Sequence, residues 1–443
     1  MSSKHLILKN VGRVYCKTFC RWEPLTVTKQ HSPMFQGKTE CFSTQTTMAS
    51  EPPTSVKLSK LLLVSKLSRY DFERCRHVDL TESELEVALR KRGADYDSLI
   101  KNHKLHKEFE QNVKKAFEDA GIEARVVNRF DYTMDKINWA DMICAVGGDG
   151  TFLLAAGRVT DNRKPVIGFN SDPRRSEGYL SLNKKYSTNI EEAVRKLKQG
   201  EFKWRFRNRI RIILCGENVH EDPVELHEQE LLGSNQRFFS AVPESRLESN
   251  VVSPAETNVQ QRRLPVLALN EVFIGENLSA RVSYYEMRMN DGPRTKIKSS
   301  GLCVTTGTGS TSWNLSINRL TQQSVSEVLR LLQEKRPELL PALTHESALV
   351  QDLADEFNSS LVFSAEDTRM GYTIRDLISA GVWPQPKGVE PRGFASRIEV
   401  KSRCLDAGLV VDGGLSFRFN DGTVAILEIH ESDALRTVDL NEP

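Results

Sequence analysis

The sequence predicts an α/β domain, doubly wound around a parallel sheet, followed by a β-rich domain. Short apolar runs alternate with amphipathic helical segments from Lys60 onward, which is typical of parallel strands joined by helical crossovers. Beyond about Gly200 the pattern changes to closely spaced strands, and two Asn-Asp-Gly triplets have the composition of hairpin turns. A length of 443 residues is ample for two domains, each with its own core.

The first domain is assigned to residues 57–200. Strands are predicted at KLLLVSK, IEARVVNR, ADMICAV and KPVIGFN, and helices at ESELEVALRKR and HKEFEQNVKKAFEDAG. Gly121 follows the last apolar position of the second helix, where a helix C-terminus is expected. His103 and His106 lie in a charged helical stretch, and we expect a solvent-exposed helix face there rather than a metal site.

The second domain, residues 201–420, shows the period of two that strands have. In KWRFRNRIRI the basic residues at odd positions, from Lys203 to Arg211, would share one face of a single strand. This basic row is either a solvated sheet face or a surface that attracts an anionic substrate. A final segment, residues 421–443, could pack back on the first domain.

Two insertions interrupt the second domain. Residues 218–263 are polar and weakly periodic, as in a long surface insertion. Residues 318–358 have helical character, with an apolar stripe formed by Val325, Val328, Leu329 and Leu332. The stripe either packs on its own domain or forms a contact for a partner subunit.

The first residues of the chain have the composition of an organellar transit peptide. Five basic residues precede the first acidic residue, Glu23, and a stretch rich in serine and threonine follows. We therefore predict a transit peptide and linker at residues 1–56, with a disordered tail as the alternative.

Composition excludes several classes of protein. The net charge of +2 is too small to indicate a nucleic-acid-binding protein. No apolar run approaches the roughly 18 residues that a membrane span needs. The eight cysteines are scattered without a CxxC pair, which argues against a disulfide framework or a zinc site. We expect neither nucleic-acid binding nor membrane insertion.

The sequence GGDGT, Gly147 to Thr151, joins an apolar strand to a helical stretch. Gly147, Gly148 and Gly150 let the backbone approach a ligand, and the first N–H groups of the helix, near Thr151, could cradle a phosphate. That phosphate would repel Asp149 unless the carboxylate binds Mg²⁺ or accepts a hydroxyl proton. The alternative is an ordinary strand-to-helix turn with an Asx cap.

Two further polar features follow. The turn TGTGSTS comes after the strand GLCV; it lacks the Walker lysine and the third glycine of GxGxxG, but its hydroxyl and N–H groups suit phosphate, ribose or adenine. Asn270 and Glu271 interrupt an apolar strand, where each would cost roughly 1–3 kcal/mol if buried without a partner. A bound ribose or a strand-end turn could supply that partner.

These residues together resemble the NAD kinase family. Four signatures stand in the family's order: GGDGT, Asn270-Glu271, the TGS turn at Thr308 to Ser310, and Asp412-Gly413. Stretches such as SYYE and VVDGG are similar to its animal mitochondrial branch. The resemblance implies a Rossmann-like first domain, an architecture shared with diacylglycerol kinases, and Mg²⁺-dependent transfer of phosphate from ATP to the adenosine ribose 2′-hydroxyl of NAD in the mitochondrial matrix.

The resemblance also implies roles for individual residues. Asp149 would act on the nucleophilic hydroxyl, the glycine turn would admit the phosphates, and Mg²⁺ would arrive with ATP rather than on protein side chains. The residues implied to bind NAD are Asn270, Glu271, Thr308, Gly309, Ser310, Thr311, Ser312, Ser316 and Asp412. A homodimer is expected, and a lipid kinase or a non-catalytic NADP(H)-binding sensor remain the alternatives.

The sequence departs from the family in three places. The glycine-rich segments that commonly follow the TGS turn are replaced by the helical RLTQQSVSEVLRLLQEK. The family's usual TPTGSTAY reads TGTGSTSW, with Gly307 in place of proline and Trp313 in place of tyrosine. The glycine-containing loop that usually follows the strand PVIGFN is replaced by SDPRRSEGY.

Overall fold

The structure is a computed structural model, and it describes residues 58–217, 219–229, 260–338, 347–378 and 390–440. The transit peptide predicted at 1–56 lies outside the described residues, as does most of the polar insertion predicted at 218–263. Only the short elements β7 (Val224–Glu225), α8 (Leu226–Gln229) and β8 (Gln260–Arg263) are described within that insertion.

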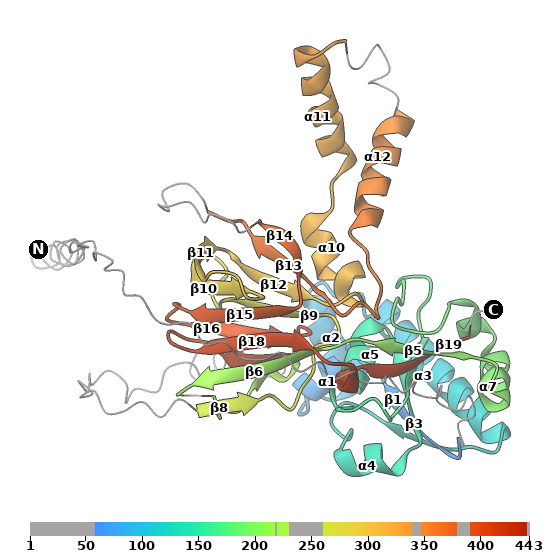
Figure 1. Cartoon of the computed structure of the whole chain (residues 1–443). Coiled ribbons are helices and arrows are strands. Elements are labelled where there is room, and N and C mark those ends of the chain that lie inside the picture. The colour runs from blue at the N-terminus through green and yellow to red at the C-terminus, as the bar shows by residue number, and fades with distance from the viewer. Residues whose placement is uncertain (1–57, 218, 230–259, 339–346, 379–389, 441–443) are drawn as a thin grey trace, which may run out of the picture. The chain divides into compact units, whose positions relative to one another are not determined.

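A four-stranded parallel sheet in the order β2-β1-β3-β4 forms the first part of the fold, and Figure 1 labels its central strands β1 and β3. Its strands are β1 (Lys60–Ser65), β2 (Glu123–Val127), β3 (Met142–Gly147) and β4 (Val166–Asn170). The apolar runs form strands because both sheet faces are buried: Leu61 and Leu63 face one core, and Leu62 and Val64 face the other. The α/β domain predicted from the alternating pattern is confirmed.

Helices cover both faces of this sheet. They are α1 (Arg69–Arg76), α2 (Glu82–Lys91), α3 (Tyr96–Asp119), α4 (Met134–Trp139), α5 (Asp149–Gly157), α6 (Lys185–Thr188) and α7 (Ile190–Gln199). Helices α3 and α7 contribute to one core, and α4 and α5 to the other. Ser68 and Thr81 begin α1 and α2 with reciprocal capping boxes, and Gly200 ends α7 in the left-handed conformation.

Two antiparallel sheets form the β-rich part. One has the order β11-β10-β15-β18-β6-β8, and the other β14-β13-β12-β9-β16-β17-β7. Their remaining strands are β6 (Ile210–Gly216), β9 (Glu271–Glu276), β10 (Ser283–Met289), β11 (Thr295–Ser299), β12 (Gly301–Thr305), β13 (Met370–Arg375), β14 (Arg392–Ala395), β15 (Arg397–Ser402), β16 (Ala407–Val411), β17 (Leu415–Arg418) and β18 (Val424–Ile429).

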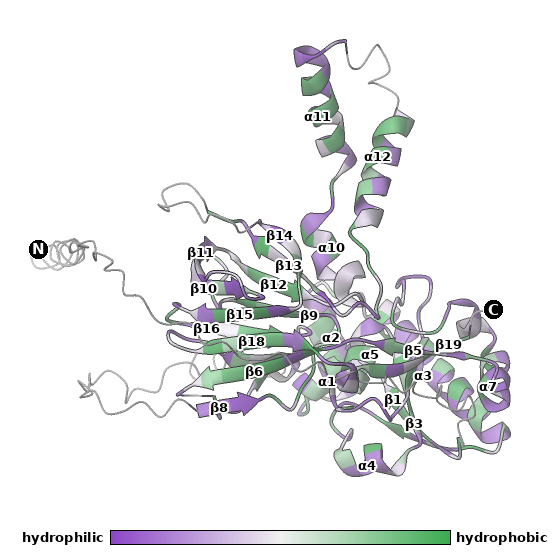
Figure 2. Ribbon diagram, viewed as in Figure 1, coloured by the Kyte–Doolittle hydropathy of each residue, from purple (hydrophilic) through white to green (hydrophobic). Residues whose placement is uncertain are grey.

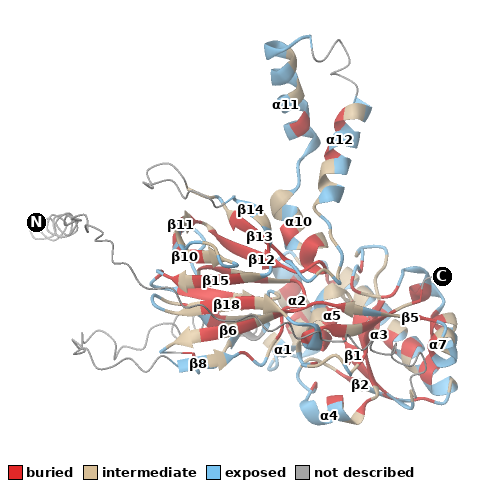
Figure 3. Ribbon diagram, viewed as in Figure 1, coloured by how far each residue is buried: buried red, intermediate tan, exposed pale blue. Residues whose placement is uncertain are grey.

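The two antiparallel sheets share one core. Apolar side chains of β6, β10, β15 and β18 from the first sheet join those of β9, β12, β13 and β16 from the second in a single buried cluster. Figure 2 shows the strands β6 and β18 as largely apolar, and Figure 3 shows buried residues along β6, β15 and β18, none of whose residues is fully exposed. The β-rich domain predicted from the period of two is therefore confirmed as a two-sheet sandwich.

The prediction that KWRFRNRIRI forms one strand with a basic face is wrong. The segment forms β5 (Lys203–Arg207) and β6, which belong to different sheets. The break lies at Asn208, whose backbone N–H donates to the Ala365 carbonyl at 2.8 Å and whose Nδ2 donates to the carbonyls of Glu366 and Asp367. The basic residues therefore share no common face.

The last described residues of the chain complete the first domain. Strand β19 (Leu435–Asp439) pairs with β5, after a 3₁₀ turn at Glu431–Asp433. Val438 and Leu440 lie in the same core as the helices α3 and α7. The hydroxyl of Tyr186 donates to the Leu440 carbonyl at 2.7 Å, which ties the chain end to α6.

Two helices, α11 (Gln322–Lys335) and α12 (Ser347–Ser360), occupy the predicted helical insertion and lie side by side (Figure 1), and α10 (Trp313–Asn318) precedes them. Val325 of α11 packs on Val350 and Ala354 of α12. The predicted apolar stripe is therefore only partly buried: Val325 packs on α12, whereas Val328 is 64% exposed and Leu332 is 37% exposed.

Within the described ranges, none of the helices has the length and apolar character that crossing a membrane requires.

Candidate functional site

The GGDGT turn lies at the carboxyl edge of the parallel sheet, between β3 and α5. Its strand neighbours β1, and the N–H of Lys66 donates to the Val146 carbonyl at 2.9 Å. Strand order reverses between β1 and β3, and ligands of open α/β sheets bind at such reversals. A Cβ on Gly147 would overlap the hydroxyl of Thr151 and lie 2.9 Å from the Lys66 Cβ, so only glycine fits there.

Gly148 and Gly150 are not required by packing within the chain. A Cβ on Gly150 would have no neighbour within 4 Å, and one on Gly148 would lie 3.8 Å from the hydroxyl of Ser176. Glycine at these two positions therefore leaves open space beside the N-terminus of α5. Unpaired N–H groups at a helix N-terminus favour an anion in such a space.

The carboxylate of Asp149 is held in place by the loop that follows β4. Its Oδ1 accepts the N–H of Leu180 at 3.0 Å, and its Oδ2 accepts the N–H of Tyr179 at 3.2 Å. The loop is shaped by buried Asn170, whose Nδ2 donates to the Ser176 carbonyl at 3.0 Å. The replaced sequence SDPRRSEGY thus ends with one of the two amides that orient Asp149, that of Tyr179, and the next residue, Leu180, supplies the other, a role that the sequence pattern did not indicate.

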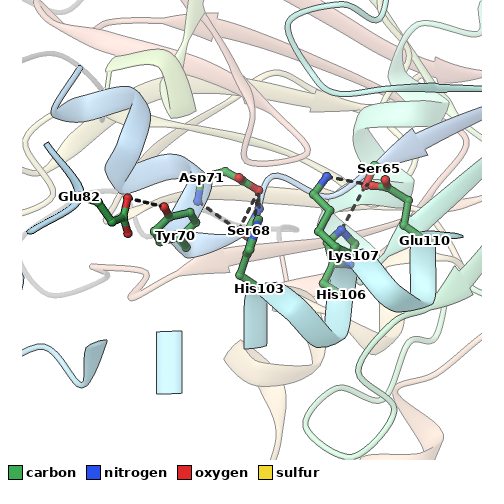
Figure 4. A network of polar contacts seen from close by, with 9 residues as sticks. All are labelled: Ser65, Ser68, Tyr70, Asp71, Glu82, His103, His106, Lys107 and Glu110. Atoms are coloured by element: carbon green, nitrogen blue, oxygen red, sulfur yellow. Dashed lines mark hydrogen bonds and ion pairs between the residues drawn. The ribbon is translucent and has the colours of Figure 1, made fainter. Parts of the chain in front are cut away.

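A polar network fixes the end of β1 beside this turn (Figure 4). The hydroxyl of Ser65 donates to the carboxylate of Glu110 and lies 3.1 Å from Nε2 of His106. Burial, with the Lys66 charge adding to it, lowers the pKa of His106 to about 4. The prediction of an exposed helix face is wrong at His106, which is 4% exposed because α3 lies against the end of β1.

Asp412 supports the segment that contains Asn270 and Glu271. Its carboxylate accepts the N–H groups of Leu269 and Asn270 at 2.8 Å and that of Glu271 at 3.0 Å. Burial raises the pKa of Asp412 to about 6, and the three amide hydrogen bonds oppose that rise. Its backbone is in the left-handed region, with φ of 48°. Asp412 therefore positions the Asn-Glu segment through the backbone.

The TGTGS turn packs directly on the same segment. The Asn270 carbonyl accepts two hydrogen bonds from neighbouring residues: one from the N–H of Thr306 at 2.9 Å and one from the hydroxyl of Thr305 at 3.1 Å. A Cβ on Gly309 would overlap that carbonyl. A Cβ on Gly307 would overlap the Ser364 carbonyl, which explains why this chain has glycine where proline is usual in the family that it resembles.

Three polar atoms of these two segments are buried and lack a hydrogen-bond partner among the described residues. They are Asn270 Oδ1, Glu271 Oε2 and Thr308 Oγ1. Burial, with the neighbouring Asp412 charge adding to it, raises the pKa of Glu271 to about 8, so its carboxyl is largely protonated at neutral pH. Each unpaired group costs roughly 1–3 kcal/mol, so the three atoms indicate a polar ligand.

The other residues predicted to bind NAD lie around the TGTGS turn. The Ser310 hydroxyl is buried and donates to the Gly307 carbonyl at 2.6 Å, while the Ser312 hydroxyl accepts Asn270 Nδ2 at 3.1 Å. The Thr311 hydroxyl donates to the Thr308 carbonyl at 3.3 Å. Ser316 lines a cavity of about 650 Å³ between α10 and β13.

Packing and hydrogen bonds bring the two polar turns together. Leu269, which precedes Asn270, lies in one apolar cluster with Phe152 and Ala155 of α5. The buried guanidinium of Arg209 donates to carbonyls of Ala156 and Asp433. Helix α5, which begins at Asp149, is therefore packed against and hydrogen-bonded to the β-rich part beside the Asn-Glu segment.

Across the ranges that the structure describes, no three His, Cys, Asp or Glu side chains form a group that could hold a metal ion. A magnesium ion is a hard cation that prefers oxygen ligands and commonly binds through one or two carboxylates plus substrate phosphates. Asp149, beside the glycine turn, could supply one such carboxylate, and the substrate phosphates that bring the ion would supply further ligands.

The chain is similar to known proteins over most of its length. Residues 76–202 match a family model described as the ATP-NAD kinase N-terminal domain. The chain is 42% identical over 387 residues to "NAD kinase 2, mitochondrial" of Rattus norvegicus, covering 87% of this chain and 88% of the relative. The human protein of the same name is also 42% identical, with 85% of it covered, and that of Xenopus tropicalis is 40% identical, with 91% covered.

Proposed function

The chain belongs to the NAD kinase family, and from that premise we propose how its own site carries out the reaction. It transfers the terminal phosphate of ATP to the 2′-hydroxyl of the adenosine ribose of NAD, which gives NADP and ADP. The observation that supports this most strongly is the position of Asp149. Its carboxylate lies at the N-terminus of α5 and is oriented by two backbone amides of the loop that follows β4.

Asp149 acts on the attacking hydroxyl. The ribose oxygen forms a bond to the terminal phosphorus, the bond from that phosphorus to the bridging oxygen of ADP breaks, and the hydroxyl proton passes to the Asp149 carboxylate. Phosphoryl transfer of this kind depends mainly on positioning and on stabilising charge. Mg²⁺ bound with ATP supplies charge neutralisation on the phosphates, while Gly148 and Gly150 leave room for them beside the helix N-terminus.

The unpaired atoms of Asn270, Glu271 and Thr308 bind the ribose and adenine of NAD. A ribose hydroxyl can both donate and accept, so it can satisfy the Asn270 Oδ1 and Glu271 Oε2 atoms that are otherwise unpaired. The TGTGS turn, from Thr308 to Ser312, and Ser316 of α10 complete the dinucleotide site.

A direct assay tests this function. The full-length protein is supplied with NAD, ATP and Mg²⁺, and NADP is measured with an NADP-specific dehydrogenase. NADP formation that EDTA abolishes is the expected result. Phosphorylation of diacylglycerol in place of NAD would indicate a lipid kinase, and NADP(H) binding without turnover would indicate a sensor; either outcome contradicts the proposal.

Replacing Glu271 with Ala should weaken NAD binding about tenfold or more, since a ribose hydrogen bond worth roughly 1–3 kcal/mol is lost. Glu271→Gln is the matched control, because the amide keeps one donor and one acceptor as the protonated carboxyl does. We expect its dissociation constant, measured by calorimetry, to stay near that of the wild type. An unchanged constant in Glu271→Ala would show that Glu271 is structural.

We also propose that the protein is a homodimer in the mitochondrial matrix. The exposed apolar residues Val328 and Leu332 of α11 make a contact with a second copy, since two-fold dimers are the commonest closed assembly. Because both side chains are exposed in the protomer, charge at these positions should separate the subunits without unfolding them.

The double variant Val328→Asp, Leu332→Asp is therefore expected to be a folded monomer in sedimentation experiments, because charged groups would be desolvated at the contact. The exposed Ser326→Asp of the same helix is the matched control and should remain dimeric. A folded double variant that is still a dimer would exclude α11 from the interface.

A fusion of residues 1–55 to a fluorescent protein should enter mitochondria, because the segment is basic and poor in acidic residues. The control fusion carries Gln at Lys4, Lys9, Arg13, Lys17 and Arg21, and it should stay in the cytosol. Equal distribution of the two fusions would contradict a targeting role for these charges.

A further inference from the structure

Arg207 is a buried cation that lacks a counter-charge in direct contact. It ends β5, its side chain is 8% exposed, and none of the carboxylates in the described ranges forms an ion pair with it. Its Nε atom has no hydrogen-bond partner there either. The nearby Arg209 is fully buried but donates to backbone carbonyls, including those of Ala156 and Asp433.

Such burial requires a compensating anion. Removing a charged group from water costs several kcal/mol even after the protein relaxes, unless a partner offsets the cost. Burial and the Arg205 charge lower the pKa of Arg207 to about 10, and the charges of Asp149 and Asp439 oppose the fall, so the guanidinium remains protonated at neutral pH. The charge therefore persists, and it attracts Asp149 without contacting it.

Arg207 lines a cavity that adjoins the loop holding Asp149. The cavity measures about 370 Å³, and its lining includes Tyr179 and Leu180, whose amides bind the Asp149 carboxylate. The other cations lining it are already paired: Arg205 with Asp439 at 2.6 Å, and Lys184 with Glu177 at 2.7 Å. Arg207 is therefore the cation of this cavity that can take a new anion.

We propose that Arg207 binds a phosphate group of the reactants next to Asp149. The planar guanidinium presents paired N–H donors that match two phosphate oxygens, and the bond would be strong in this desolvated position. The proposal rests on the proposed kinase function for the identity of the phosphate, which belongs to the donor chain or to the 2′-phosphate of the product. Arg207 forms no covalent bond and stabilises charge on the phosphate oxygens.

Arg207→Met tests the role in catalysis. Loss of an aimed charge at a reacting phosphate should lower kcat/KM for ATP by about 10²-fold or more, while the dissociation constant for NAD stays unchanged. Arg207→Lys should recover part of the rate, since it restores the charge without the paired donors. The matched control is Lys203→Met, which removes an exposed charge from the other end of β5 and should leave kcat/KM unchanged. Wild-type kcat/KM in Arg207→Met would overturn the proposal.

Ligand-induced thermal shifts separate this proposal from the function on which it rests. Tripolyphosphate should raise the Tm of the wild type but not that of Arg207→Met, whether or not NADP is formed. Arg207→Met itself should keep at least the wild-type Tm without ligand, because no ion pair is broken. The proposal is overturned if Arg207→Met, or Arg207→Gln should the Met variant be unfolded, keeps both the tripolyphosphate shift and the extra shift of NADP over NAD.

The same measurement identifies the source of the phosphate. If Arg207 binds the donor, the variant loses the shifts caused by ATP and tripolyphosphate and keeps that caused by NADP. If it binds the product phosphate, the extra shift of NADP over NAD disappears instead. A wild-type protein that makes no NADP but shows an Arg207-dependent tripolyphosphate shift would refute the kinase function and leave the phosphate site standing.

Discussion

Replacing Asp149 with Asn is expected to lower kcat for NADP formation by at least ~10²-fold while the protein remains folded and binds NAD. A positioned proton acceptor typically contributes ~10²–10⁴ to a rate, and a neutral amide cannot take the hydroxyl proton. The side-chain NH₂ would also face one of the two amides, of Tyr179 or Leu180, that now donate to the carboxylate. The variant therefore loses both the acceptor and part of its alignment.

Single-turnover kinetics and NAD calorimetry on the same preparation would separate these effects. The control Asp131→Asn changes an exposed carboxylate and should have wild-type kcat. If kcat for Asp149→Asn stays within a few-fold of wild type, Asp149 has no role in proton transfer. A large loss of NAD affinity with unchanged kcat would assign Asp149 to binding instead.

Asp412→Asn should be the most damaging substitution on the dinucleotide side. The carboxylate accepts three backbone N–H groups, and an amide must place its NH₂ against one or two of them. Hydrogen bonds to a charged group are worth roughly 1.5–3 kcal/mol each, so the free energy of unfolding should fall by about 2–4 kcal/mol. Asn tolerates the left-handed backbone at this position, so backbone strain does not add to the loss.

Urea unfolding and NAD calorimetry measure the two consequences of Asp412→Asn. We expect NAD affinity to fall with stability, because the Asn270-Glu271 segment loses its support. The control Asp421→Asn removes a partner of Arg403 in an exposed ion pair, a kind of interaction worth at most about 1 kcal/mol. Lost affinity without lost stability would contradict the positioning role and indicate direct contact with NAD, as the family resemblance implies.

The parts of the fold that follow from local pattern could be predicted from the sequence. Runs such as KLLLVSK form strands buried on both faces, and this is the burial that a continuous apolar run indicates. The GGDGT turn stands out in the sequence as a candidate ligand site because Asp149 makes little sense in a phosphate-binding turn without a chemical role. Asn270 and Glu271 stand out as candidates because polar groups in an apolar strand require partners.

The parts that depend on distant contacts could not be predicted. The break between β5 and β6 is made by Asn208, whose bonds run to residues 158 and 159 positions further along the chain. The basic residues keep the period of two through the break, and Asn208 interrupts only the apolar side, which does not indicate that the two halves join different sheets. Likewise Asp412 meets the Asn-Glu segment 141 to 143 positions away, and His106 is buried only because α3 lies against β1.

The pairing of β19 with β5 has a consequence for the order of events during synthesis. The ribosome releases the strands of the parallel sheet first, yet Val438 and Leu440, which fill a core of that sheet, are made only after the whole β-rich part. A growing chain therefore cannot complete this core, or pair the strand that carries Arg207, until the β-rich part has also been translated. Chains that end before β19 retain the glycine turn and Asp149 but lack the neighbouring strand of Arg207, so we expect them to expose this apolar core and to be prone to aggregation.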